Sequence, residues 1–245
     1  EEILKYKEEK ETYLEKLADY DAYMQKLHTE WEEKQTLLTK ACEKLSKIRQ
    51  KNAAVLTQKL KAALINLNFL TVEFDIAVRP GQTITAKGYD DVEFLISTNP
   101  GESLKPLSQV ASGGELSRIM LAIKTVLAGR DEIDTLIFDE IDTGISGRTA
   151  QKVSEKLSYI ARNHQVICIT HLPQIAAMAD THFEIAKSAA AGSTTTTIHP
   201  LCGDAMAKEL ARLLGGAKIT DAGYDNAREM KVLADQSKLY KTVNN

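Results

Sequence analysis

The stretch Thr135-Leu-Ile-Phe-Asp-Glu140 carries an apolar run directly into two adjacent carboxylates. A short run of this kind predicts a buried β-strand, and in open α/β sheets ligands bind at the C-terminal ends of the strands. One carboxylate at such a strand end suits Mg²⁺, and a second suits the positioning or deprotonation of a water molecule. Many strands end in acids that only meet solvent, so this stretch alone leaves both interpretations open.

Upstream of that strand lies Ala111-Ser-Gly-Gly-Glu-Leu-Ser-Arg118. Ser112 and Glu115 have the S-x-x-E spacing of a capping box, which predicts the start of a helix. Two glycines at a helix start also expose backbone N–H groups at the positive end of the helix dipole, which is a favourable place for phosphate. A structural cap and a phosphate site are compatible, because the serine hydroxyl can serve either.

Downstream, Val166-Ile-Cys-Ile-Thr-His171 is a second apolar strand, and this one ends in an imidazole. A lone histidine after a strand is more often structural than catalytic. Helical segments at 114–128 and 148–162 alternate with strands at 135–138 and 165–170. This alternation predicts an α/β fold with a parallel sheet covered on both faces, so that the acids and His171 meet at one sheet edge.

The N-terminal part of the chain has a different pattern. No proline or glycine precedes Pro80, and apolar residues recur at two interleaved heptad positions through residues 1–62. The heptads predict a coiled-coil helix, with a long helix packed on its own domain as the alternative. The two heptad sets are Ile3, Lys10, Leu17, Met24, Trp31, Leu38, Leu45 and Asn52, and Tyr6, Tyr13, Tyr20, Leu27, Lys34, Ala41, Ile48 and Val55.

The remaining segments complete the expected architecture. Alternating residues at 72–78 and 92–96 predict two antiparallel strands. Residues 188–197 are low in complexity, which predicts a flexible loop, and helices are expected near 204–214 and 222–236.

Composition restricts the classes of function. The net charge of −3 gives no global basic character, so any DNA contact has to be local. Cys42, Cys168 and Cys202 are widely separated, which indicates reduced thiols rather than disulfides or a metal site. No apolar run is long enough for a membrane helix, and the N-terminus has no targeting pattern. We expect a cytoplasmic protein, and the missing initiator Met suggests a piece of a longer chain.

In this order, the motifs resemble those of an ABC-type ATPase head. Ser112-Gly-Gly-Glu115 resembles the ABC signature, Leu136–Glu140 the Walker B strand, and His171 the switch histidine. Thr143-Gly-Ile-Ser146 is similar to the D-loop, although Ser146 stands where the family often has Asp.

The resemblance implies a role for each of these residues. Asp139 would hold Mg²⁺, Glu140 would orient the attacking water, and His171 would contact the γ-phosphate. Ser112, Gly113, Gly114 and Glu115 would reach the γ-phosphate of ATP held by a second head, and Ser146 would belong to the D-loop of that interface.

Longer strings resemble the C-terminal half of the RecN family, which comprises SMC-like ABC ATPases of bacterial DNA double-strand-break repair. They are Ser97-Thr-Asn-Pro-Gly-Glu102, Val110–Arg118, Phe138–Gly147, Ile169–Ala177 and Glu209–Gly216. The resemblance implies a returning coiled-coil strand at 1–62 and the C-terminal lobe of an ATPase head at 63–245. It further implies ATP and Mg²⁺ as cofactors, DNA and a second head as partners, and a nucleoid-associated location.

No G-x-x-x-x-G-K-[ST] string occurs in the 245 residues, although an ABC head needs that loop to cradle the nucleotide phosphates. We therefore expect an N-terminal half of the same protein to supply the P-loop, and this chain to be inactive alone. The alternatives are another ABC ATPase, such as a transporter subunit, and a purely structural coiled-coil protein. The heptads disfavour the first, and the intact Asp139, Glu140 and His171 disfavour the second.

Overall fold

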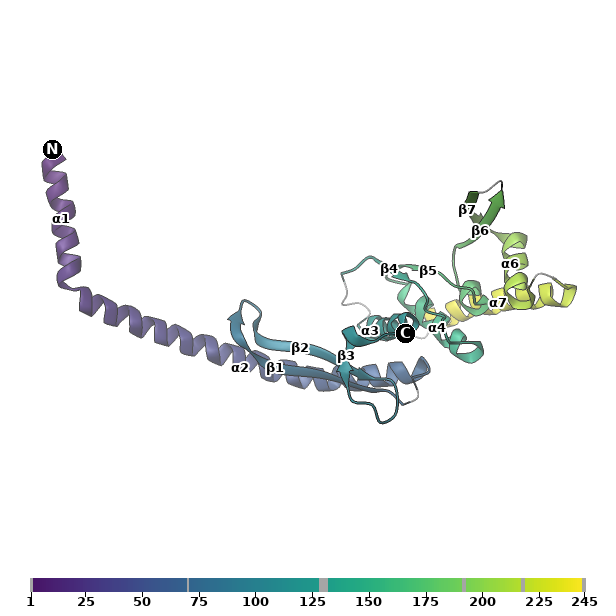
Figure 1. The fold of residues 1–245 in the computed structure, drawn as a ribbon, viewed down its shortest axis with the longest axis horizontal. Helices are drawn as coiled ribbons and strands as arrows, with labels where there is room; N and C mark the ends of the chain where they lie inside the picture. Colours follow the sequence, from purple (N-terminus) through teal and green to yellow (C-terminus); the bar gives the residue numbers. More distant parts are fainter. Residues whose placement is uncertain (1, 70, 128–131, 191–192, 217–218, 244–245) are drawn as a thin grey trace. The chain divides into compact units, whose positions relative to one another are not determined.

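The computed structural model describes residues 2–69, 71–127, 132–190, 193–216 and 219–243 (Figure 1). Its internal contacts divide the chain into two compact units. The first unit comprises Glu1–Val55 with Ile76–Glu93, and the second comprises Leu56–Asp75 with Phe94–Asn245. The expected functional boundary between residues 62 and 63 stays a prediction.

Two helices account for most of the N-terminal stretch that lacks glycine and proline. Helix α1 spans Glu2–Ala18 and α2 spans Tyr20–Asn66, so the expected single helix is interrupted at Asp19. Helical hydrogen bonds continue on both sides, since the Asp19 N–H donates to the Glu15 carbonyl and the Tyr23 N–H to the Asp19 carbonyl. Aspartate is a poor interior helix residue because its carboxylate competes for backbone N–H groups, which makes Asp19 a favourable place for the interruption.

In the first unit, the tip of a β-hairpin lies against one face of α2. Strand β1 spans Glu73–Thr85 and β2 spans Gly88–Ser97. Arg49 on α2 donates to the Asp90 carboxylate at 2.7 Å and to the Lys87 carbonyl at 2.7 Å. A Cβ on Gly88, whose φ is +92°, would lie 3.0 Å from the Leu45 side chain, so the hairpin turn approaches the helix closely. Cys42 and Ser46 are buried on this face.

A second apolar stripe on α2 is not covered within the described residues. It follows the predicted heptad positions and borders the Cys42–Ser46 face that the hairpin covers, because the heptad residue Leu45 is half-buried beside Gly88 of the hairpin. Its exposed members are Met24, Leu27, Trp31, Leu38, Ile48 and Val55. Over residues 41–55 the helix therefore has one face under the hairpin and a neighbouring apolar stripe, of which Ile48 and Val55 are exposed.

The second unit contains the alternating helices and strands. Helix α3 (Gly113–Val126), strand β4 (Thr135–Phe138), helix α4 (Gly147–Ile160) and strand β5 (Gln165–Cys168) follow one another along the chain. Strands β4 and β5 pair in parallel, with Phe138 opposite Cys168. The predicted α/β class with a long N-terminal helix is therefore confirmed. Residue 128, at the end of the expected 114–128 helix, lies outside the described residues.

The β4–β5 pair corrects one expectation. Leu136 and Phe138 on one face are buried, whereas Ile137, Ile167 and Ile169 are 67%, 45% and 48% exposed. Parallel strands are normally covered on both faces. Within the described residues, only one face of this pair is covered.

The other antiparallel elements lie before α3 and after β5. Strands β1 and β2 form a three-stranded sheet with β3 (Lys105–Pro106), which precedes the short 3₁₀ helix η1 (Leu107–Gln109). The segment 188–197 was expected to be a loop, but its described residues belong to strands β6 (His182–Ala190) and β7 (Ser193–Leu201), which pair antiparallel. Four consecutive β-branched threonines favour the strand. Residues 191–192 lie outside the described part.

The C-terminal helices close the second unit. Helices α5 (Pro173–Ala177), α6 (Gly203–Gly215) and α7 (Asp221–Val243) pack around a core of buried residues. The core includes Ala177, Met178, Leu210, Ala211 and Ala227. No described helix is both long and apolar enough to cross a membrane.

Candidate nucleotide site

Ser112 begins helix α3 as its N-cap. Its backbone is extended (φ −91°, ψ 120°), and its hydroxyl accepts a hydrogen bond from the Glu115 N–H at 3.4 Å. This confirms the predicted cap. Ser112 and Gly113 are exposed, so the first turn of α3 presents its N-terminal end to solvent.

Gly114 lets the backbone of the segment that follows β4 approach α3 closely, and Gly113 faces the Glu140 side chain. A Cβ on Gly113 would lie 2.7 Å from the Glu140 Oε2, and a Cβ on Gly114 would lie 2.9 Å from the Glu140 carbonyl oxygen. The Ser117 hydroxyl also donates to the Asp139 carbonyl at 2.8 Å. The structure thus brings the predicted signature and the acid pair together within one chain.

Glu140 has an uncommon backbone conformation. Its φ is +56°, in the left-handed region that non-glycine residues rarely adopt. Its N–H donates to the Asp139 Oδ1 at 2.9 Å, and both side chains are exposed at the end of β4. A strained backbone conformation persists only where the surrounding structure enforces it, and such conformations cluster at functional sites.

Arg118 is a site residue that the sequence did not reveal. It is buried, and its Nη1 donates to the carbonyls of Ile141 at 3.3 Å and Thr143 at 2.7 Å. The guanidinium lies over the Phe69 ring, 5.6 Å from its centroid. Burial lowers the pKa of Arg118, and the charge of Glu115 opposes this shift. The two hydrogen bonds from Arg118 to these carbonyls join α3 to the segment that carries the predicted D-loop.

His171 contacts a second residue that sequence analysis missed. Asp142 is buried, and its Oδ2 lies 3.0 Å from the His171 Nδ1. The same oxygen accepts from the His171 N–H at 2.8 Å and from the Thr170 hydroxyl at 2.6 Å. Only the spacing Asp139–Glu140–Ile141–Asp142 could have suggested a third acid, and spacing does not show which acid turns inward.

Ser146 follows the acid pair along the chain, and Cys168 is the last residue of β5. Ser146 is exposed and precedes α4, whose first turn it begins without a side-chain cap. Burial, then the negative charges of Asp142 and Asp139, raises the pKa of Cys168 to about 12. The thiol therefore stays protonated at neutral pH and is no nucleophile.

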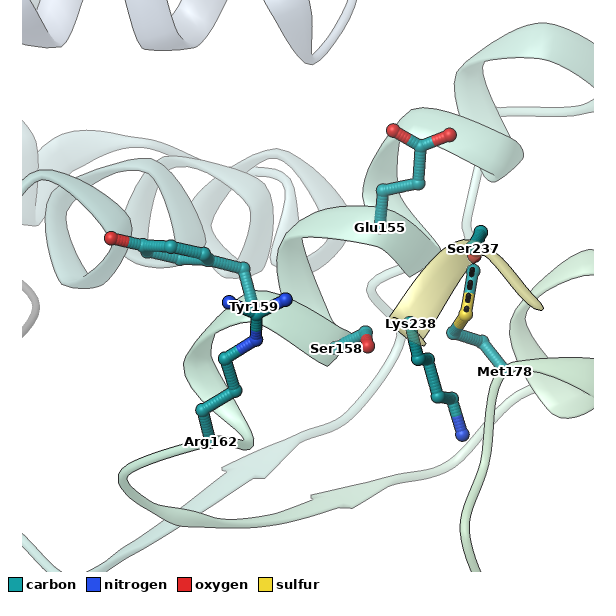
Figure 2. Close-up of a pocket in the computed structure, with 7 residues that line it drawn as sticks. All are labelled: Glu155, Ser158, Tyr159, Arg162, Met178, Ser237 and Lys238. Atoms are coloured by element: carbon teal, nitrogen blue, oxygen red, sulfur yellow. Dashed lines mark hydrogen bonds between the residues drawn. The ribbon is translucent and has the colours of Figure 1, made fainter. Parts of the chain in front are cut away.

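A cavity of about 300 Å³ adjoins this region. It lies between the turn after α2, the start of α3 and the predicted D-loop. The lining residues are Leu67, Asn68, Phe69, Thr71, Thr98, Glu115, Arg118, Gly144 and Ile145. A second hollow, of about 10 Å³ between α4 and α7, holds no more than one water (Figure 2). There the Ser237 hydroxyl donates to the Met178 sulfur.

The described residues contain no cluster of three metal-ligating side chains. Asp139 offers a single exposed carboxylate at the end of β4. Mg²⁺ at nucleotide sites often takes only one or two carboxylates and completes its shell with phosphates and water. The donor set therefore fits Mg²⁺ that arrives with a nucleotide, and does not fit an all-protein metal cage.

A capped glycine-rich helix start, an acid pair at a strand end and a histidine beyond the neighbouring strand follow one another in the second unit, in the order that the resemblance to ABC-type ATPase heads predicts. The chain is 40% identical over 253 residues to the DNA repair protein RecN of Bacillus subtilis. The aligned region covers 97% of this chain and 44% of that protein. It is 39% identical over 213 residues to RecN of Deinococcus radiodurans, and this alignment covers 87% of the chain and 35% of that protein. The chain belongs to the RecN family and spans less than half the length of these relatives.

No model of a known protein family matches the chain. Among solved structures, the fold is similar to an Smc head domain with a coiled coil and joint from Pyrococcus yayanosii. The TM-score is 0.47 and the sequence identity 20%, and the match covers 66% of this chain and 29% of the Smc chain. It is also similar to the SMC head domain of Thermotoga maritima, with a TM-score of 0.34 and 20% identity. This match covers 66% of the chain and 52% of the SMC head domain chain.

Proposed function

We propose that this chain is the C-terminal half of an SMC-like ATPase of DNA double-strand-break repair. In the whole protein, ATP bound between two dimerised heads and its hydrolysis would drive conformational change on DNA. The observation that carries the proposal is similarity to DNA repair proteins along 97% of the chain. The sequence also has Ser112, Asp139, Glu140 and His171 in the order of the motifs that an ABC-type site uses, which supports the proposal.

Each site residue has a physical task in this proposal. Glu140 orients or deprotonates the attacking water, and His171 contacts the γ-phosphate. Ser112, Gly113, Gly114 and Glu115 face the γ-phosphate of a nucleotide on the second head, where helix N–H groups favour an anion. Ser146 belongs to the same interface.

Asp139 is the residue that would hold Mg²⁺. When bound, Mg²⁺ would neutralise negative charge on the phosphates of the nucleotide. The other residues of the acid segment, Asp139–Ser146, do not need to contact the ion, because nucleotide oxygens and water complete its shell.

The N-terminal half of the same protein is the proposed partner that brings the P-loop. Two observations support this. The 245 residues contain no P-loop string. The β4–β5 pair exposes Ile137, Ile167 and Ile169, an apolar face that parallel strands normally cover. The further partners are a second head and DNA, and the proposed location is the cytoplasm, in association with the nucleoid.

A reconstitution experiment tests the proposal. This chain and a separately produced N-terminal half are assayed for ATP hydrolysis, each alone and mixed. We expect no turnover by residues 1–245 and restored turnover in the mixture, because no loop in this chain cradles the β-phosphate. A Glu140→Gln chain in the same mixture controls for contaminating ATPases. Turnover by this chain alone, or none in the mixture, contradicts the proposal.

A further inference from the structure

Asp142 differs from the two acids that precede it. Asp139 and Glu140 are exposed, whereas the Asp142 side chain is only 5% exposed. A buried carboxylate is costly unless hydrogen bonds compensate it. The contacts of Oδ2 come from the segment that follows β5, where the Thr170 hydroxyl, the His171 N–H and the His171 Nδ1 lie 2.6, 2.8 and 3.0 Å from this oxygen.

The chemistry of a carboxylate determines the direction of these bonds. An ionised carboxylate only accepts, so every partner has to donate. The Thr170 oxygen in turn accepts from the Leu172 N–H at 3.0 Å, which agrees with a hydroxyl that donates to Asp142. By the same argument His171 Nδ1 has to carry a proton. The hydrogen bond made by one ring nitrogen decides what the other can do.

The His171 ring has little else to hold it. Its side chain is 71% exposed, so without the contact to Asp142 the ring would be free to rotate in solvent. With Nδ1–H directed to Asp142, Nε2 is the nitrogen left to meet a ligand. When both nitrogens are protonated, Nε2–H can donate to a phosphate oxygen while Nδ1–H stays on the carboxylate.

We propose that Asp142 is a positioning residue that fixes the orientation and tautomer of His171, and thereby directs Nε2 to the γ-phosphate. The assignment rests on the proposed function, in which His171 contacts that phosphate. Asp142 lies between Glu140 and the predicted D-loop segment Thr143–Ser146. It therefore connects the end of β5 to both parts of the acid segment.

The first test concerns the ring and needs no enzyme activity. Long-range ¹H–¹⁵N NMR of the histidine-labelled protein reports which ring nitrogens are protonated, and His171→Gln identifies the His171 signals among the five histidines. We expect a protonated Nδ1 in the native protein and a shift toward the Nε2–H tautomer in Asp142→Ala. An unprotonated Nδ1 in the native protein overturns the proposal.

The second test is a double-mutant cycle on ATP turnover in the complete protein. We expect Asp142→Ala to lower kcat about 10-fold or more and to change the KM for ATP less than about 2-fold, the pattern of a group that acts in the transition state. In a His171→Gln background, Asp142→Ala should cause no further loss, because the two residues act as one unit. An equal loss in both backgrounds overturns the proposal.

Two controls keep the cycle decisive. Asp142→Asn keeps the shape of the side chain. If Asp142→Ala fails to fold, Asp142→Asn replaces it in the double-mutant cycle with His171→Gln. Asp180→Asn removes a carboxylate of the same unit that pairs with Lys238, and it should leave turnover unchanged. If the native complete protein does not hydrolyse ATP, the proposed function fails, while the NMR measurement still decides the Asp142–His171 arrangement.

Discussion

The carbonyl oxygen of Glu140 occupies the space in which a side chain on Gly114 would begin, 2.9 Å from an ideal Cβ. The same Cβ would lie 2.9 Å from the Thr143 Cβ. Neither neighbour is the end of a flexible side chain, so neither can move aside cheaply. Gly114 is therefore required for the close packing of α3 against the acid segment, independently of any role toward nucleotide.

Gly114→Ala should accordingly destabilise the protein. Forcing a methyl group into a packed contact costs about 1–3 kcal/mol. Urea unfolding measures the loss. Gly215→Ala is the matched control, because among the described residues no atom lies within 4 Å of a Cβ at that position, the last residue of α6. It should be neutral or stabilising by up to about 1 kcal/mol. Equal stabilities of the two variants would contradict the packing argument.

Glu140→Gln should spare ATP binding and stall hydrolysis in the complete protein. The amide keeps the side-chain shape but no longer accepts a proton or holds water strongly. Loss of such a group lowers rates by about 10²-fold or more. Single-turnover hydrolysis and nucleotide-binding assays separate the two steps, and ATP-bound dimers should accumulate. Unchanged turnover would assign the catalytic role to another residue.

Ser112→Arg should abolish ATP-dependent head dimerisation while leaving ATP binding by the P-loop half intact. A bulky cation at the N-terminus of α3 opposes the helix dipole and fills the proposed phosphate position. Ser112→Ala is the control for the cap, whose loss costs about 1 kcal/mol. Thermal unfolding and size-exclusion chromatography with ATP are measured on both variants. If Ser112→Arg dimerises normally and only loses stability, Ser112 is a cap and nothing more.

Acid should weaken the docking of the hairpin on α2 through Asp90. A hydrogen bond from Ser46, then the bond and charge of Arg49, lowers the pKa of Asp90 below its usual 3.8. Because the folded-state pKa is the lower one, the stabilisation is complete above about pH 4 and is lost as the pH falls through the folded-state pKa. The stability difference between the native protein and Asp90→Asn should therefore shrink below pH 4. A constant difference would show that the charge of Asp90 contributes nothing.

The exposed heptad stripe of α2 should bind another helix. In the complete protein we expect the outgoing coiled-coil strand, and in this chain alone a second copy. Leu38→Glu places a charge in the stripe, whereas Thr36→Glu places the same charge on the exposed opposite side of the helix. Sedimentation equilibrium should show association of the native chain that Leu38→Glu weakens and Thr36→Glu does not. Equal behaviour of the two variants would argue against a coiled-coil seam.

Local patterns in the sequence were enough to predict several features. The Ser112 cap depends on atoms three residues apart, the β4–β5 pair on short apolar runs, and the N-terminal helices on the absence of glycine and proline. Each of these depends on neighbours in the chain, which the sequence displays directly. The prediction of a loop at 188–197 was wrong because low complexity outweighed the strand propensity of four threonines.

Other features depend on residues far apart in sequence, and only the tertiary structure decided them. Arg118 reaches Thr143, and Asp142 turns inward to His171 while Asp139 and Glu140 face solvent. Nothing in the order of residues distinguishes a buried acid from an exposed one, because burial is decided by which segments pack together. The sequence by itself determined the family motifs and their elements. Which side chains hold those motifs in place was decided by the packing of α3, the acid segment and the end of β5 against one another.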